Sequence, residues 1–282
     1  MRNALRYGFP TLACLLTTLG AQPVTNEFPL SSERELIVIV DVSFGTLVFE
    51  RAPQGKVAVV RYEDPEESRD RLQVTYEDGS RGKLRIRSKS SSHVFGENDT
   101  HVEDRRIVVQ CTDRVPISFD VELGAGRGEL DLTGLKVQEF RLSTGASDVR
   151  LWCNEPNPIP ADNVEIESGV SKFTAENLSN LNFRRLTFNG GVGYYNLDFG
   201  GTLVRDADVS IDVGLGAVVV NVPVHVNARL HYDDGWFSRF SLAGDFRRTK
   251  SGVYETEGYS DARHRLDIRI DSGLGSVKIR RR

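Results

Sequence analysis

Carboxylates recur at one place beside a repeated glycine, and they are the residues here whose spacing could do chemistry. Glu122, Glu167 and Asp212 each lie two residues before such a glycine. If the repeats stack as strands roughly 4.8 Å apart, Glu122 and Glu167 lie about 9.6 Å apart, near the upper end for inverting glycosidases. The remaining members of this column are Ser143, Asn189 and Asp271. The polar members between the acids favour a solvated face, so we predict no catalytic residue.

Histidine and aromatic residues supply the other candidates. His93 and His101 share one acidic loop, but the sequence has no HExxH or CxxC motif, and we predict neither a metal site nor a cofactor. Trp236, Phe237 and Phe240 lie close together near the C-terminus. These aromatic side chains could form an interaction patch for a partner or pack inside a cap of the fold. Packing is the interpretation we favour.

The glycines themselves define a repeat. Clear copies read IDVGLGAVVV at 211–220 and IDSGLGSVKI at 270–279, and five of the glycines follow one another at intervals of 21, 24, 22 and 23 residues. A self-similar period of this length indicates a repeat architecture. We predict structural roles for the glycines of this column: Gly124, Gly145, Gly169, Gly191, Gly214 and Gly273.

Each copy continues with alternating apolar residues, for example Leu197 and Phe199, or Val220 and Val222. Such alternation is typical of a strand with one buried face. A single repeat cannot bury that face, whereas stacked repeats can. Because parallel crossovers are nearly always right-handed, we predict an all-β, right-handed β-solenoid with rungs of roughly 22 residues. An antiparallel β-sandwich is the alternative.

The rest of the chain is assigned around this stack. Residues 1–21 are predicted as a signal peptide, 22–34 as a linker and 35–282 as one β-solenoid domain with an N-terminal β region. Gly45 lies between two predicted strands and could mark a degenerate first repeat. Residues 231–262 break the period, and we expect an inserted hairpin or cap that covers the open end of the stack.

The first residues indicate export. Arg2 and Arg6 precede a short apolar run that ends in small residues, as in a cleaved signal peptide. The sequence before Cys14 is a poor lipobox, so a lipid anchor is not expected.

Cys111 and Cys153 are predicted to stay unpaired, because similar corners two rungs apart exceed the reach of a disulfide. A net charge of −4 is too small to indicate a partner, and the acidic pI of about 5.8 argues against nucleic acid.

Two stretches carry a resemblance to a known family. The first is DRVPISFDVELGAGRGELDLTGL at 113–135 with the following STGASDVRL, and the second is GDFRRTKSGVYETEGY ahead of LDIRIDSGLGSVKIR at 266–280. Both resemble the toast-rack domain of bacterial envelope proteins. The wider group includes proteins named "putative adhesins" and the cell-wall-active antibiotic response proteins. The resemblance extends over roughly residues 35–281 and implies an extracytoplasmic β-solenoid without an assigned active site.

These observations together predict a non-enzymatic exported protein, in the periplasm or at the cell surface. Its expected role is binding or scaffolding in the cell envelope, related to adhesion or envelope stress, with an unknown envelope protein or glycan as partner. One alternative is a polysaccharide-active β-helix enzyme that uses Glu122, Glu167 and Asp212. Another is a regulatory partner of a membrane sensor.

Overall fold

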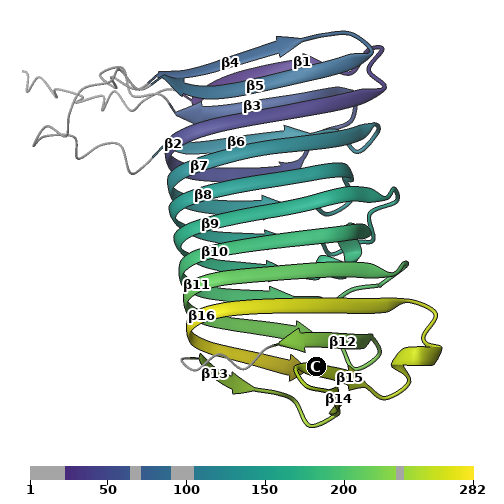
Figure 1. Ribbon diagram of the computed structural model, residues 1–282. Helices are drawn as coiled ribbons and strands as arrows, with labels where there is room; N and C mark the ends of the chain where they lie inside the picture. Colours follow the sequence, from purple (N-terminus) through teal and green to yellow (C-terminus); the bar gives the residue numbers. More distant parts are fainter. Residues whose placement is uncertain (1–22, 64–70, 90–104, 233–237) are drawn as a thin grey trace, which may run out of the picture.

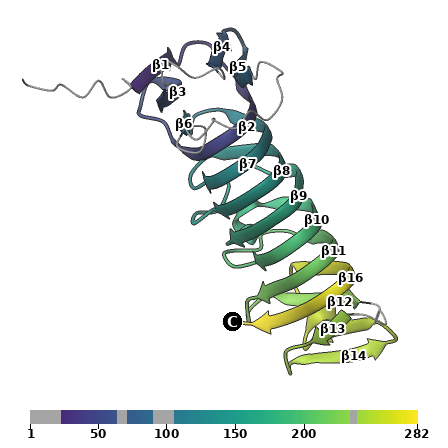
Figure 2. The same cartoon turned by 90° about the vertical axis from the view of Figure 1, so that its left-hand side faces the viewer.

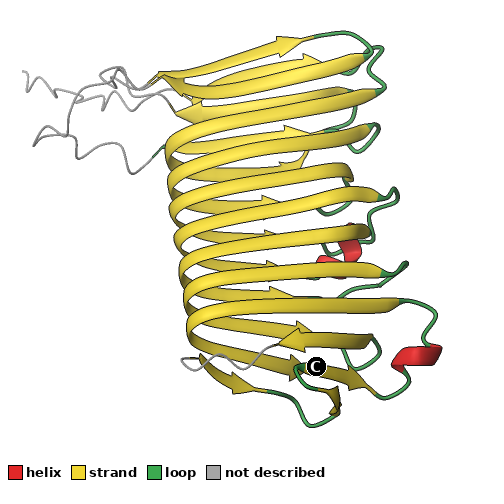
Figure 3. Cartoon of the chain, in the orientation of Figure 1, coloured by secondary structure: helices red, strands yellow, loops and turns green. Residues whose placement is uncertain are grey.

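The described part of the chain folds mainly into β-strands (Figure 3). The computed structural model describes residues 23–63, 71–89, 105–232 and 238–282. The strands are β1 (Pro23–Pro29), β2 (Glu35–Arg51), β3 (Lys56–Glu63), β4 (Arg71–Glu77), β5 (Arg81–Lys89), β6 (Arg106–Cys111), β7 (Pro116–Asp131), β8 (Lys136–Trp152), β9 (Ala161–Glu176), β10 (Phe183–Asp198), β11 (Ala207–Val222), β12 (Asn227–Tyr232), β13 (Ser238–Ser241), β14 (Phe246–Lys250), β15 (Val253–Thr256) and β16 (Arg265–Arg281). The connections between the described strands include two short 3₁₀ helices, η2 (Leu178–Leu181) and η3 (Tyr259–Asp261). In these ranges no helix is long and apolar enough to cross a membrane.

The long strands lie side by side in one parallel stack (Figure 1). Their order is β2, β7, β8, β9, β10, β11 and β16. The apolar residue three before each predicted glycine is paired with its equivalent on the next strand, in the series Val121, Leu142, Ile166, Phe188, Ile211 and Ile270. This parallel register excludes the antiparallel β-sandwich for these strands. Gly45 pairs with Gly126, so β2 belongs to the same repeat.

Each long strand bends once, at the edge that faces the viewer in Figure 2. At Gly214 the backbone of β11 passes close to β10: a Cβ there would lie 3.1 Å from the carbonyl oxygen of Gly191. Two residues later Gly216 has φ +142°, a region that residues with a side chain rarely adopt. Glycine at the bend therefore avoids a tight contact at position 214 and supplies the backbone conformation at position 216.

The core lies between the two halves of the bent strands. Phe173, Phe188 and Tyr195 are fully buried there, with ring centroids 5.3 Å apart for the phenylalanine pair and 5.2 Å apart for Phe188 and Tyr195. The Tyr195 ring fills the space at Gly190, where a Cβ would lie 2.8 Å from it. Large and small residues on neighbouring positions thus give the close packing of a protein interior.

The N-terminal end differs from the predicted linker. Residues 23–29, expected as part of a linker, form β1, which pairs antiparallel with β3. β1 is an edge strand, and its three central residues, Thr25 to Glu27, are polar. Phe28 anchors it by stacking on Tyr76 with centroids 4.8 Å apart. The first half of β2 pairs in parallel with β5, and β4 pairs antiparallel with β5 at the edge of the sheet.

The C-terminal end carries the inserted segment. The strand β16 lies between β11 and β12 and pairs with both in parallel. Next to β12, the strands β15 and β14 form an antiparallel hairpin, and β13 pairs with the second half of β16. A bulge between Arg248 and Lys250 interrupts the outermost strand, β14, a feature that hinders edge-to-edge pairing.

Candidate functional site

The carboxylates predicted to form a column do so. Glu122, Glu167 and Asp212 occupy one register position along the stack, with Ser143 and Asn189 between them. The register adds Asp41 at one end and Asp271 at the other. All the acidic members are exposed.

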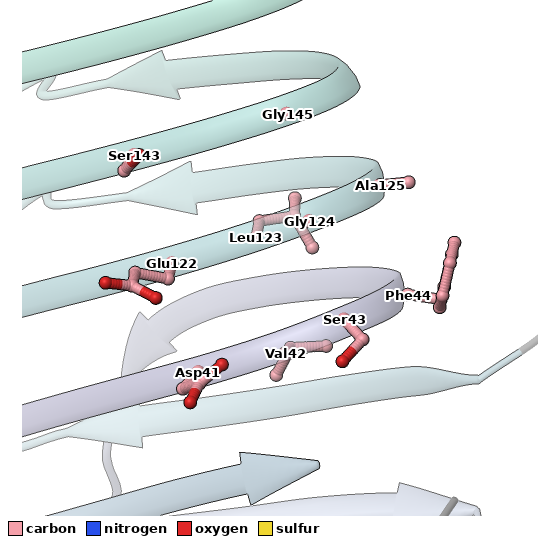
Figure 4. A pocket seen from close by; sticks show the side chains of 10 residues that line it. All are labelled: Asp41, Val42, Ser43, Phe44, Glu122, Leu123, Gly124, Ala125, Ser143 and Gly145. Carbon is pink, nitrogen blue, oxygen red and sulfur yellow. The ribbon is translucent and has the colours of Figure 1, made fainter. Parts of the chain in front are cut away.

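A shallow hollow of about 480 Å³ lies beside this column, next to the bends of β2, β7 and β8 (Figure 4). Its walls include Asp41, Glu122 and Ser143, together with apolar Phe44 and Ala125 at the bend. A glycosidase keeps one carboxyl protonated by burial, whereas Asp41 and Glu122 lie on an open face. The exposure of these carboxylates therefore favours the interpretation of the column as a solvated polar face over that of a glycosidase site.

The bend carries a feature that the sequence analysis did not single out. Each strand has two bend positions, each occupied by glycine or serine, and between them lies one outward residue that is large and apolar on most strands. The exposed members are Phe44 (46 %), Val170 (65 %), Val192 (44 %), Leu215 (44 %) and Leu274 (50 %). Ala125 and Ala146 complete the series, which we call the bend ridge. The apolar residue between the two glycines of the clear copies, Leu215 and Leu274, was the sequence signal that could have revealed it.

The predicted aromatic patch is described only in part. Trp236 and Phe237 lie outside the described residues. Phe240 is partly buried, stacks on Tyr232 with centroids 4.3 Å apart and contacts Tyr254 at 5.6 Å. This side chain thus packs within the cap.

Metal-ligand candidates do not come together in the described ranges. His93 and His101 lie outside them. His225 is placed beside the carbonyl oxygen of Gly201, at 3.4 Å. Among the described residues, no group of three or more histidine, cysteine, aspartate or glutamate side chains could hold a metal ion.

The two described cysteines are free and buried, as predicted. Burial raises the pKa of the Cys111 thiol to about 12. The pKa of Cys153 is also raised to about 12, chiefly by burial, although a backbone hydrogen bond with Glu155 opposes the shift. Both therefore remain thiols at neutral pH and are poor nucleophiles.

The C-terminal arginines are not a free basic tail. The Arg281 side chain is only 9 % exposed and donates a hydrogen bond of 2.6 Å to Asp245. It also donates to the carbonyl oxygens of Val226 and Val224, each at 2.8 Å, and lies over the Phe246 ring. Arg281 thus fastens the hairpin cap to the last strand of the stack.

Replacing Arg281 by alanine is expected to destabilise the cap by about 2–3 kcal/mol, because charge-assisted hydrogen bonds are lost and two carbonyls lose their donor. Hydrogen exchange of amides in β14 and β15 would measure the loss. Lys278→Ala, at an exposed position of the same strand, is the control and should leave exchange unchanged. Equal protection in both variants would contradict a fastening role.

Comparison with known proteins gives the family. The family described as "N-terminal domain of toast_rack, DUF2154" matches residues 22–176. No curated protein sequence matches the chain. A solved structure described as a "putative cell adhesion protein" from Clostridium sporogenes is similar with 15% identity and a TM-score of 0.47, covering 93% of this chain and 100% of that one. A "putative adhesin" from Bacteroides fragilis has 13% identity and a TM-score of 0.37, covering 92% and 97%. A "putative lipid binding protein" from Parabacteroides distasonis has 9% identity and a TM-score of 0.29, covering 92% and 96%.

The family match extends over more than half of the sequence and includes β1 to β9. It contains the first copies of the bend glycine and the stacked strands on both sides of them. The chain belongs to the toast-rack family.

Proposed function

We propose that this protein is an exported, non-enzymatic binding or scaffolding protein of the cell envelope, with a role in adhesion or the response to envelope stress. Its partner is an envelope protein or glycan. The observation that carries this proposal is the in-register stack, which repeats the same outward positions on successive strands. An extended polymer or a repetitive surface can contact such an array at many equivalent points, and many weak contacts add up to firm binding.

The proposal includes the form of the stack. We take it to be a right-handed solenoid in which each rung comprises about 22 residues and one bend. The pairing offsets support this period, since Ile166 on β9 pairs with Phe188 on β10 and Phe188 pairs with Ile211 on β11. Neighbouring rungs then supply most of each other's buried surface, which makes the array rigid along its axis.

Sedimentation with isolated cell-wall polymer tests the binding role. We expect the purified protein to co-sediment, and the triple variant Glu122→Gln, Glu167→Gln, Asp212→Asn to change the bound fraction without changing the melting temperature. Absence of co-sedimentation, together with absence of any crosslinked envelope protein in cells, would contradict the proposal. Release of soluble sugar by the wild type, lost in Glu167→Gln, would instead support the enzyme.

Export is expected to leave a mature chain that begins at Gln22. The charged start, the short apolar run and the small residues that end at Ala21 are the basis for this cleavage site. Intact-mass measurement on protein from the native host checks it. A mass that retains Met1, or a lipid on Cys14, would show that the assignment is wrong.

A further inference from the structure

The bend ridge concentrates the exposed apolar side chains of this molecule. Nine large hydrophobic residues are exposed in the described ranges, and five of them are Phe44, Val170, Val192, Leu215 and Leu274. Single exposed apolar residues are ordinary, whereas contiguous ones mark interaction surfaces. We therefore expect the ridge to be an interaction surface that a partner covers.

The ridge is continuous because its members are neighbours in the sheet. Val170 pairs with Val192, Val192 with Leu215, and Leu215 with Leu274. Strand spacing places successive side chains about 4.8 Å apart, so the ridge from β2 to β16 is roughly 29 Å long. Each member lies between two small residues, glycine or serine, and Figure 4 shows Phe44 and Ala125 projecting outward at the bend.

The two flanks of the ridge differ in charge. Three residues before the ridge lies the acidic column, in which Glu122 and Glu167 belong to β7 and β9. Two residues after the ridge, the same strands carry the exposed cations Arg127 and Lys172. Asp148 of β8 lies between them in the same register and pairs with Lys172 at 3.5 Å. The β7 and β9 rungs are therefore negative on one flank and positive on the other.

From this arrangement we infer that the ridge binds the ridge of a second copy of this chain, with the two stacks parallel and related by a twofold axis along the ridge. Such a rotation exchanges the flanks. On the β7 rung Glu122 then faces the side that carries Arg127 of the other copy, and on the β9 rung Glu167 faces the side that carries Lys172. Equivalent ridge residues meet at the axis, Val192 against Val192 and Leu215 against Leu215.

Charge rules out the antiparallel alternative. A twofold axis across the ridge would bring each acidic flank against the acidic flank of the other copy. That flank holds five carboxylates in one column: Asp41, Glu122, Glu167, Asp212 and Asp271. Like charges set opposite one another in an interface oppose association, so the parallel arrangement is favoured.

The contact is small. A strip roughly 29 Å long and about 15 Å wide covers on the order of 450 Å² per copy, about half of a standard protein interface. Self-association in solution is therefore weak, with a dissociation constant of roughly 10 μM to 1 mM. Copies held together on one surface would associate readily, because their effective concentration reaches the millimolar range. This inference does not depend on the proposed envelope role.

Site-directed disulfide formation tests both the contact and its orientation. The full mature chain carries one new cysteine at a time, in Val170→Cys, Val192→Cys or Leu215→Cys, while Cys111 and Cys153 are buried and do not compete. In the parallel pair each variant crosslinks to itself on mild oxidation at about 100 μM protein. An antiparallel pair would crosslink at one position at most. The control is Val224→Cys, which lies off the ridge at 65 % exposure, the same as Val170, and should stay monomeric.

Sedimentation over a range up to about 1 mM gives the affinity without new cysteines. Replacement of Val170, Val192 and Leu215 by serine is expected to raise the dissociation constant more than tenfold, and Arg127→Glu with Lys172→Glu at least threefold at low salt. Circular dichroism confirms that the variants fold. A wild type that is monomeric at 1 mM, or crosslinking of Val224→Cys as efficient as that of Val192→Cys, would overturn the inference. Ridge-dependent binding to lipid vesicles without self-association would also overturn it.

Discussion

Replacing Gly216 by valine is expected to lower the free energy of unfolding by about 3 kcal/mol or more. The backbone at Gly216 has φ +142°, which costs roughly 1–3 kcal/mol for a residue with a side chain. In addition, a Cβ at this position would overlap the carbonyl oxygen of Gly193 on the neighbouring strand. Backbone on both sides of the contact belongs to the stack, so neither side can yield cheaply. Urea melts followed by circular dichroism would measure the change.

Two variants in the same strand calibrate this result. Gly214→Val should cost less, because φ there is ordinary and a Cβ would lie 3.1 Å from the carbonyl oxygen of Gly191. Asp212→Asn should be close to neutral, since the side chain is exposed. The expected order of destabilisation is Gly216→Val, then Gly214→Val, then Asp212→Asn. A wild-type melting temperature for Gly214→Val would show that this glycine is incidental, and one for Gly216→Val would contradict the described bend.

Removal of one whole period, residues 192–214, is expected to leave a folded protein. The deletion joins Gly191 to Leu215, and the pairing of β10 with β11 shows that Val218 and Val220 then take the places of Tyr195 and Leu197. Valine does not fill the space that the Tyr195 ring occupies at Gly190, so we expect a loss of about 2–4 kcal/mol. Cooperative urea unfolding and a molecule shorter by about 4.8 Å along the stack would be the result.

Removal of half a period is the matched control. Deleting residues 192–203 leaves part of one strand without a continuation, breaks the register and exposes its apolar side chains, so the chain should unfold or aggregate. In a fold built from nearest-neighbour rungs the two deletions differ sharply. If the full-period variant is as unfolded as the half-period one, the solenoid interpretation is wrong.

The stack could be predicted because every rung is subject to the same structural constraints. Each rung obeys the same two constraints, an alternating apolar face and a glycine at the bend, and six copies make such a pattern visible above chance. Register followed from the same pattern, which is why the column of Glu122, Glu167 and Asp212 was placed correctly. The parallel pairing followed from the spacing of the copies.

The ends of the stack could not be predicted in the same way, because they occur once. The sequence of β1 reads as a polar linker, and only its contact with β3 and the stacking of Phe28 on Tyr76 make it a strand. Arg281 reads as a surface charge, yet the carbonyls that it binds belong to a loop 55 and 57 residues away. Such long-range, unrepeated contacts leave no periodic trace in a sequence.

The position of β16 between β11 and β12 determines the order in which these strands can pair during synthesis. The segment after β11 emerges from the ribosome well before β16 does, but its strand β12 pairs with β16 and with β15. Until the seventeen residues of β16 are available, β11 keeps an unpaired edge and the hairpin has no strand on which to dock. Closure of this edge therefore waits for the synthesis of β16. A chain truncated before Arg265 would remain open at that edge, recognisable to proteases and prone to pair with strands of other chains.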